Sequence, residues 1–351
     1  MKRVNTLHAA LLGATCWALC AVSMARSPAA GADLPLRVYF IDVEGGQATL
    51  FVTPAHESLL IDTGWAGHAA RDAKRIVQAA RRAGVQRLDY VLLTHYHIDH
   101  AGGAAQLLAR IPVGTFVDHG PNREPGDADT EHSWQEYLRL VKSRVPRLIV
   151  KPGQRLPLKG AEVSVISADG DLIEHPLDGA GGTNAFCTGV APYAGDDTEN
   201  ARSLGVLVRF GHLRLLDLGD LTLAKEQALM CPVNKLGKID VYIVSHHGWN
   251  QSNSPVLLSG LAPRIAIMDN GATKGGSPSV IDGLLHTSGA EALWQLHFSV
   301  EGGPQHNTAP AHIANLPGAD TGAFLLLAGH EDGRVEVLNS RTGHRQLYPA
   351  P

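Results

Sequence analysis

The stretch Thr94-His95-Tyr96-His97-Ile98-Asp99-His100 decides the fold and the chemistry of this chain. It places three imidazoles and one carboxylate within six residues, directly after the apolar run 90–93. If residues 90–94 form a buried strand, its end directs these side chains into one cleft, where imidazole nitrogen and carboxylate oxygen suit zinc or a similar first-row ion. A polar turn of solvated histidines is the alternative, but surface histidines rarely follow an apolar strand in this pattern. The segment therefore predicts a metal site at a strand end.

The pattern His95-x-His97-x-Asp99-His100 resembles the signature of the metallo-β-lactamase superfamily, whose binuclear hydrolases use it to build two adjacent metal sites. Three further motifs follow the order expected from that superfamily, and each stands behind an apolar run. These motifs are Asp62-Thr63-Gly64, Gly219-Asp220 and Ser245-His246-His247-Gly248. Together the matches extend from about residue 38 to residue 270.

Within the superfamily, the sequence is most similar to the hydrolase domain of ComEC-type competence proteins and their free-standing relatives. Residues 40–48, Phe-Ile-Asp-Val-Glu-Gly-Gly-Gln-Ala, resemble that group's D-V-G-Q-G-D-A, with an altered order of glycine, glutamine and acid. The Asn-Ala-Arg-Ser-Leu stretch at 200–204 and the His-His-Gly motif strengthen the likeness. ComEC-type proteins carry this domain beside a large membrane channel. No apolar segment of channel length is present in this sequence, so the resemblance extends only to the hydrolase portion of those proteins.

The resemblance implies an α/β fold, the αββα sandwich, in which two facing sheets lie between outer helices and the metals sit at one shared edge. It also implies a set of ligands. We expect His95 and His97 to bind one ion, Asp99, His100 and His247 to bind the other, and Asp220 to bridge them, with Asp62 bracing the metal loop. Two divalent cations, zinc by default, would turn water into a hydroxide nucleophile at neutral pH. The catalytic candidates are Asp99 and His246, the latter as proton donor or oxyanion stabiliser.

The first metal site lacks the third histidine that many superfamily members supply between the H-x-H-x-D-H motif and the bridging aspartate. His119 stands at a strand end but arrives early, and His175 lies at a better distance without motif support. His297 and His306 flank a Gly-Gly-Pro loop after an apolar strand, where they could contact substrate or serve as ordinary surface or supporting residues. All four are candidates for an additional ligand or a substrate contact.

The amino-terminal segment reads as a secretory signal peptide spanning residues 1–32. Two basic residues at 2 and 3 precede an apolar stretch of about 14 residues, which falls short of the ~20 needed to span a bilayer. We therefore expect export to the periplasm or the medium, and a mature chain, 33–351, that forms one hydrolase domain without a membrane span. The Gly- and Asp-rich stretch 169–199 is too long for an ordinary connection and is interpreted as an inserted functional loop over the site.

Only two cysteines, Cys187 and Cys231, remain in the mature chain, so it can form at most one disulfide. Such a bond suits an oxidising compartment and would stabilise the fold by about 4 kcal/mol in the chain-entropy model. The sequence leaves the bonded and unbonded states open. A cysteine zinc site is disfavoured because the chain has no C-x-x-C pair.

Charge bears on the substrate. Loss of residues 1–32 removes three basic and no acidic groups, which takes the net charge from −4 to −7. This balance disfavours tight DNA binding. Since the resemblance favours a phosphodiester, we expect a nucleic-acid or small-molecule phosphodiester as substrate. A lactone or β-lactam hydrolase is the alternative, and it should need a complete three-histidine first site and a roomy apolar pocket. A non-catalytic binding module is the second alternative.

Overall fold

Two mixed β-sheets carry the fold in the computed structural model, which describes residues 1, 34–143 and 145–351. The predicted signal peptide and its cleavage site therefore lie outside the described residues, apart from Met1. In the first sheet the described strands have the order β18-β17-β16-β1-β2-β3-β4-β5-β6. Their bounds are β18 Arg345–Tyr348, β17 Val335–Asn339, β16 Leu325–Gly329, β1 Leu36–Phe40, β2 Thr49–Val52, β3 Ser58–Ile61, β4 Leu88–Leu92, β5 Val113–Asp118 and β6 Arg147–Ile149.

The second sheet has the order β15-β14-β13-β12-β11-β10-β8-β7, with β9 paired to β8. Its strands are β15 Ile313–Asn315, β14 Ala292–His297, β13 Ile265–Met268, β12 Val241–Ile243, β11 Leu213–Asp217, β10 Gly205–Phe210, β9 Asp171–Leu172, β8 Glu162–Ala168 and β7 Arg155–Leu156. Strands β3 to β6 of the first sheet and β11 to β15 of the second are parallel, and the remaining pairs are antiparallel.

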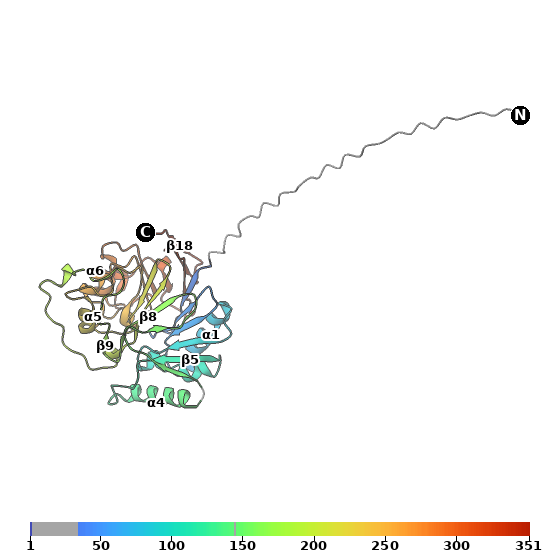
Figure 1. Cartoon of the computed structure of the whole chain (residues 1–351), viewed down its shortest axis with the longest axis horizontal. Coiled ribbons are helices and arrows are strands. Elements are labelled where there is room, and N and C mark those ends of the chain that lie inside the picture. The colour runs from blue at the N-terminus through green and yellow to red at the C-terminus, as the bar shows by residue number, and fades with distance from the viewer. Residues whose placement is uncertain (2–33, 144) are drawn as a thin grey trace. The chain divides into compact units, whose positions relative to one another are not determined.

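Three hydrophobic clusters show how the layers stack. The largest joins inward side chains of both sheets, such as Phe40, Ile61, Ile243 and Trp294, so the sheets face each other. A second cluster packs the outer face of the first sheet against α1 and α4, and a third packs the outer face of the second sheet against α5 to α7. Figure 1 shows the strands between α1 and α4 on one side and α5 and α6 on the other. The expected αββα sandwich is thus confirmed.

The helices are short. They are α1 Arg71–Arg82, α2 Ile98–Ala101, α3 Ala104–Leu108, α4 Ala128–Ser143, α5 Leu223–Met230, α6 Pro255–Leu261, α7 Pro278–Leu285 and α8 Gly303–His306. Single 3-10 turns are η1 His68–Ala70, η2 Ala185–Cys187, η3 Asn200–Arg202, η4 Ser245–Gly248 and η5 Pro310–His312. Among the residues that the structure describes, no helix has the length and apolar character required to cross a bilayer.

Two sequence-based expectations need adjustment. Strand β4 ends at Leu92 rather than at Thr94, because the main-chain N–H of Thr94 donates to Asp62 Oδ1 instead of to a neighbouring strand. The stretch 169–199 does not lie over the site along its whole length. Much of it runs beside α5 and α6, where a disulfide joins Cys187 to Cys231, and only its end at Glu199 reaches the strand-end region.

Parallel strands fix the place of the candidate site. In sheets of this kind, polar groups gather beyond the carboxyl ends of parallel strands. The loops after β3 and β4 meet the loops after β11 and β12 there. The close approach of Gly219, after β11, to Thr94, after β4, shows how tightly these loops pack. A Cβ atom on Gly219 would lie 2.9 Å from the Cβ of Thr94, and the φ of +56° also favours glycine. The two sheets therefore present their strand ends to one shared space.

Candidate metal centre

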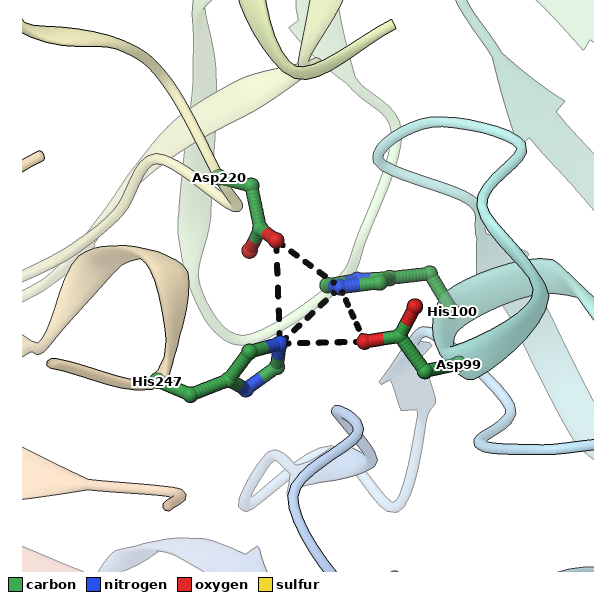
Figure 2. A group of neighbouring side chains, drawn as sticks. All are labelled: Asp99, His100, Asp220 and His247. Carbon is green, nitrogen blue, oxygen red and sulfur yellow. Dashed lines mark hydrogen bonds and ion pairs between the residues drawn. The ribbon is translucent and has the colours of Figure 1, made fainter. Parts of the chain in front are cut away.

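Four side chains converge in that space. Asp99 and His100 lie on α2, Asp220 follows β11, and His247 lies in η4 after β12. One potential ligand atom from each lies within 4.8 Å of all the others, and all four residues are buried. Figure 2 shows the two imidazoles and two carboxylates pointing toward one another. Imidazole and carboxylate together form a donor set that suits zinc and similar first-row transition-metal ions.

Asp220 is the centre of the cluster. Its Oδ2 lies 3.3 Å from His100 Nε2 and 3.6 Å from His247 Nε2. The same oxygen lies 3.5 Å from His246 Nε2 and 4.0 Å from His95 Nε2. Burial alone would raise the pKa of Asp220, but the histidines around it, His100 first, hold that pKa well below its ordinary value. A single carboxylate that faces four imidazole nitrogens is well placed to be shared between two cations.

Two buried atoms lack partners that the protein itself could supply. Among the described residues, neither His95 Nε2 nor Asp220 Oδ1 has a hydrogen-bond partner. The other ring nitrogen of His95, Nδ1, lies 3.0 Å from Thr94 Oγ1, which leaves Nε2 turned toward Asp220. Buried polar atoms are rarely left unpaired without a reason, and the binding of an ion is one of the usual reasons. The residues therefore fit a metal centre.

A carboxylate stands behind each of the two inner imidazoles. Asp62 Oδ2 lies 2.7 Å from His100 Nδ1, and Asp269 Oδ1 lies 3.5 Å from His247 Nδ1. Burial lowers the pKa of His100, but Asp220, Asp99 and Asp62 raise it well above its ordinary value. These carboxylates thus favour positive charge on His100, whereas burial lowers the pKa of His95 and that of His246. Carboxylates of this kind fix the orientation and the basicity of metal-binding histidines.

The histidine motif after β12 has an uncommon backbone. Both His246 and His247 adopt φ of +54°, in the left-handed region that residues other than glycine seldom occupy. The turn is fixed from behind by Asn253, whose Nδ2 donates to the Ser245 carbonyl and whose Oδ1 accepts from the Tyr242 hydroxyl. Strained residues that persist in a rigid frame cluster at functional sites. The conformation aims both adjacent imidazoles at Asp220.

His97 and His119 occupy neighbouring positions with partners of their own. His97 Nε2 lies 3.2 Å from Glu124 Oε2, and His95 and His97 have ring centroids 4.6 Å apart. His119 is buried with its Nε2 3.2 Å from Glu199 Oε2, and it makes no hydrogen bond or ion pair with Asp220 within the described chain. His97 thus flanks His95, whereas His119 is held by a carboxylate that the sequence analysis did not single out.

The three remaining candidates lie elsewhere. His175 is exposed and lines a separate cavity with Lys151 and Glu174. His306 pairs with Asp282 on α7, its Nδ1 2.8 Å from the carboxylate. His297 is buried at the end of β14, but its Nε2 lies 2.7 Å from Asp42 Oδ1. The structure does not bring these three histidines to Asp220.

His297, Asp42 and Glu44 form a second group that could hold a cation by its residue types. However, Asp42 already contacts both His297 and Arg75, whose Nη1 donates to Asp42 Oδ2 at 3.0 Å. Arg75 also pairs with Asp320. Because Arg75 shares its positive charge among these carboxylates, the group forms an ion-pair network beside the loop after β1.

The sequence analysis did not identify some of the residues at the centre. Asp269 follows the apolar run of β13, so the strand-end pattern that identified Asp62 and Asp220 could have found it. Glu124 and Glu199 lie in loops without periodicity, and Lys274, which contacts Asp99, lies in a glycine-rich turn. No motif marks these three.

Two facing sheets with this cluster of histidines and carboxylates at their shared edge define a metal-binding αββα protein. The family model described as "Metallo-beta-lactamase superfamily" matches residues 41–188. Residues 41–188 accordingly match a metallo-beta-lactamase domain, as the sequence resemblance predicted.

Comparisons with individual proteins agree with the ComEC-type likeness. The chain is 27% identical over 233 residues to Recombination protein 2 of Haemophilus influenzae, covering 66% of this chain and 24% of that protein. It is 27% identical over 236 residues to Competence protein ComA of Neisseria gonorrhoeae, covering 65% of this chain and 26% of that protein. The chain thus spans about a quarter of the length of these competence relatives.

Two further matches are a curated relative and a solved structure. Hydroxyacylglutathione hydrolase of Acidiphilium cryptum is 32% identical over 147 residues, which cover 41% of this chain and 45% of that protein. Among solved structures, the metallo-beta-lactamase fold protein YhfI from Bacillus subtilis is 13% identical, with a TM-score of 0.45 over 74% of this chain and 96% of that chain.

Proposed function

We propose that this protein is an exported binuclear metal-dependent phosphodiesterase. The observation that carries the proposal is the Asp220 cluster, in which one buried carboxylate oxygen faces four imidazole nitrogens at 3.3 to 4.0 Å. Two divalent cations, when bound, would lower the pKa of a water molecule toward about 7 and polarise the bond to be cleaved. The protein's own contribution is to hold the ligands in a buried and fixed arrangement.

The residues divide into two sets around Asp220. We assign Asp99, His100 and His247 to one cation and His95 and His97 to the other, with Asp220 shared. His246 supplies the third imidazole of the second set, because its Nε2 approaches Asp220 Oδ2 as closely as the Nε2 of His247 does. This assignment replaces the substrate-facing role that the sequence alone favoured for His246. It also gives the site of His95 and His97 a third imidazole without His119 or His175.

The phosphodiester preference rests on the relatives and on charge. Two matched relatives are named for recombination and competence, and the ComEC-type resemblance implies cleavage of DNA. The acidic balance of the chain counts against a long DNA substrate, because phosphate contacts depend on basic side chains. A small phosphodiester, such as a nucleotide or a lipid headgroup, satisfies both considerations.

A second candidate is a thioester hydrolase, favoured by the 32% identity to hydroxyacylglutathione hydrolase over 147 residues. A lactone or β-lactam hydrolase is a third candidate. Neither His119, which lies against Glu199, nor His175, which lines a separate cavity, completes the site of His95 and His97, but His246 would give that site three imidazoles.

A substrate panel separates these functions. Full-length protein of known metal content would be assayed against bis-p-nitrophenyl phosphate, S-lactoylglutathione, a lactone and a β-lactam, beside an Asp220→Ala variant. The proposal predicts diester turnover that is lost in the variant. Turnover of the thioester or the lactone alone would contradict the phosphodiesterase and leave the metal centre in place. Activity on none of these substrates, with metal bound, would favour a binding module.

Export is supported by the apolar amino-terminal segment and by the Cys187–Cys231 disulfide, because such bonds persist in oxidising compartments. Cell fractionation followed by amino-terminal sequencing would test it. We expect the protein outside the cytoplasm, beginning at residue 33. An unprocessed chain in the cytoplasm would contradict export.

A further inference from the structure

Lys274 is a positively charged side chain at the edge of the Asp220 cluster. Its ammonium group donates to the Gly45 carbonyl at 2.7 Å and contacts the carboxylate of Asp99. The same nitrogen lies 5.5 Å from the ring centroid of Trp65 and 5.3 Å from that of Trp249. The ammonium is thus held between two indole faces, an arrangement that attracts cations.

The loop that carries Lys274 also supports a ligand of the cluster. Gly271 N–H donates to the Lys274 carbonyl, and Gly276 N–H donates to the His247 carbonyl at 2.9 Å. Gly275 has a φ of +76°, and a Cβ atom there would collide with the His247 backbone. Lys274 therefore has a fixed position relative to the cluster, as a residue that must meet a reacting group should have.

Lys274 retains the capacity to bind one more group. An ammonium has three N–H donors, and the described residues provide two hydrogen-bond acceptors, Gly45 and Asp99. The Lys274 side chain is 21% exposed, and Trp65 and Trp249 are also partly exposed. The charge next to the buried carboxylates can therefore be reached from solvent, unlike Asp220 and the inner imidazoles.

We infer that Lys274 is a substrate-binding residue, whose ammonium receives an anionic oxygen of the substrate and selects substrates that carry negative charge beside the reacting bond. The inference deepens the proposed phosphodiesterase function and rests on the same site. A lysine acts as a compact point charge toward phosphate, and such charge-assisted hydrogen bonds are about twice as strong as neutral ones. Trp65 and Trp249 act as positioning residues that keep the ammonium at the rim.

Substrate binding by Lys274 and a purely structural role of the Lys274–Asp99 ion pair predict different results. If Lys274 only neutralised Asp99, its loss would weaken the metal centre. Turnover of charged and of neutral substrates would then fall by the same factor. If it binds the substrate's charge, its loss would weaken anion binding and change the preference between charged and neutral substrates while the metal stays bound.

The test uses the full-length, metal-loaded protein and three variants. Lys274→Gln removes the charge, Lys274→Arg restores it, and Lys159→Gln removes a matched lysine–carboxylate ion pair at the surface, where the Lys159 side chain is 79% exposed and pairs with Glu57. Calorimetry gives the Kd of inorganic phosphate. Steady-state kinetics give the ratio of kcat/KM for bis-p-nitrophenyl phosphate to that for neutral p-nitrophenyl acetate, and elemental analysis gives metal content.

For Lys274→Gln we expect at least a tenfold rise in the Kd of phosphate and at least a tenfold fall in the kinetic ratio, at wild-type metal content. Lys274→Arg should recover part of both, and Lys159→Gln should match wild type. Equal phosphate affinity, an equal fall for both substrates, loss of metal from Lys274→Gln, or no phosphate binding by wild type would each overturn the inference. Wild type that binds phosphate but cleaves no diester would refute the phosphodiesterase proposal alone, because the Kd comparison still decides the role of Lys274.

Discussion

Removal of the Asp62 carboxylate should damage both stability and metal binding. Asp62 is fully buried, and it accepts hydrogen bonds from Thr94 N–H at 2.8 Å and from Thr94 Oγ1 at 2.7 Å. Its Oδ2 also lies 2.7 Å from His100 Nδ1. Burial raises the pKa of Asp62, and the contact with His100 partly offsets this effect. Asp62→Ala therefore leaves two buried donors and one imidazole without their partner.

The size of the effect follows from these contacts. Removal of one partner of a buried ion pair costs about 3–5 kcal/mol, because the other partner stays behind unpaired. Loss of the carboxylate behind a metal-binding histidine typically lowers metal affinity by about 10–100-fold. For Asp62→Ala we expect both losses together, since the same carboxylate holds the backbone of Thr94 and the ring of His100.

Urea unfolding of the metal-free protein would measure the first effect, and a titration against a chromophoric chelator would measure the second. Asp89→Ala is a matched control, because Asp89 Oδ2 accepts from Ser58 N–H and from Ser58 Oγ at 2.9 Å, but contacts no imidazole. We expect the control to lose stability and keep its metal affinity. Metal affinity of Asp62→Ala within twofold of wild type, or an equal loss in Asp89→Ala, would refute the positioning role.

Three further changes have defined outcomes. Gly46→Ala should destabilise by about 1–3 kcal/mol in thermal unfolding, because its Cβ would collide with the Asp99 carbonyl oxygen. Burial raises the pKa of Glu226 to about 7 from its ordinary 4.5. The free energy of unfolding should therefore fall by on the order of 3 kcal/mol as pH rises from about 4.5 to about 7. Glu226→Gln should reduce this fall when unfolding is measured across the same pH range. Cys187→Ser should lower the free energy of unfolding by about 4 kcal/mol, because the bond to Cys231 closes a loop across 44 positions.

Each of these has an outcome that would contradict it. Gly126→Ala is the control for the glycine, because no atom lies within 4 Å of its added Cβ, and equal destabilisation of both variants would refute the steric argument. A wild-type stability that stays level between pH 4.5 and 7 would show that Glu226 ionises normally in the fold. If a reducing agent lowers the melting temperature of Cys187→Ser as much as that of wild type, the disulfide is not the source of the stabilisation.

Local sequence predicted the parts of the centre that follow apolar strands. The metal motif after β4, Asp62 after β3, Asp220 after β11 and His247 after β12 all stand where a buried run ends, and parallel strands bring such ends to one edge. The structure brings these residues together as the pattern indicated. The fold class was also predicted correctly, because the motifs resemble those of a superfamily that has this fold.

The candidate histidines that lie apart from Asp220 have partners that are distant in the chain. His297 does end an apolar strand, but the loop after β1 places Asp42, 255 positions away, against its ring. His119 was considered as a ligand because it follows β5, yet Glu199 from the inserted stretch lies 3.2 Å from its Nε2. Spacing along the sequence cannot show which long-range carboxylate reaches a histidine first, since that depends on how the loops pack.

Metal stoichiometry tests the central claim most directly. Full-length wild type and Asp220→Ala would be saturated with zinc, freed of excess metal and analysed for metal per chain. Because Asp220 is the carboxylate shared by both ligand sets, the account predicts two equivalents in wild type and at most one in the variant. Wild type that retains no metal, or a variant that retains two equivalents, would contradict a binuclear centre at Asp220.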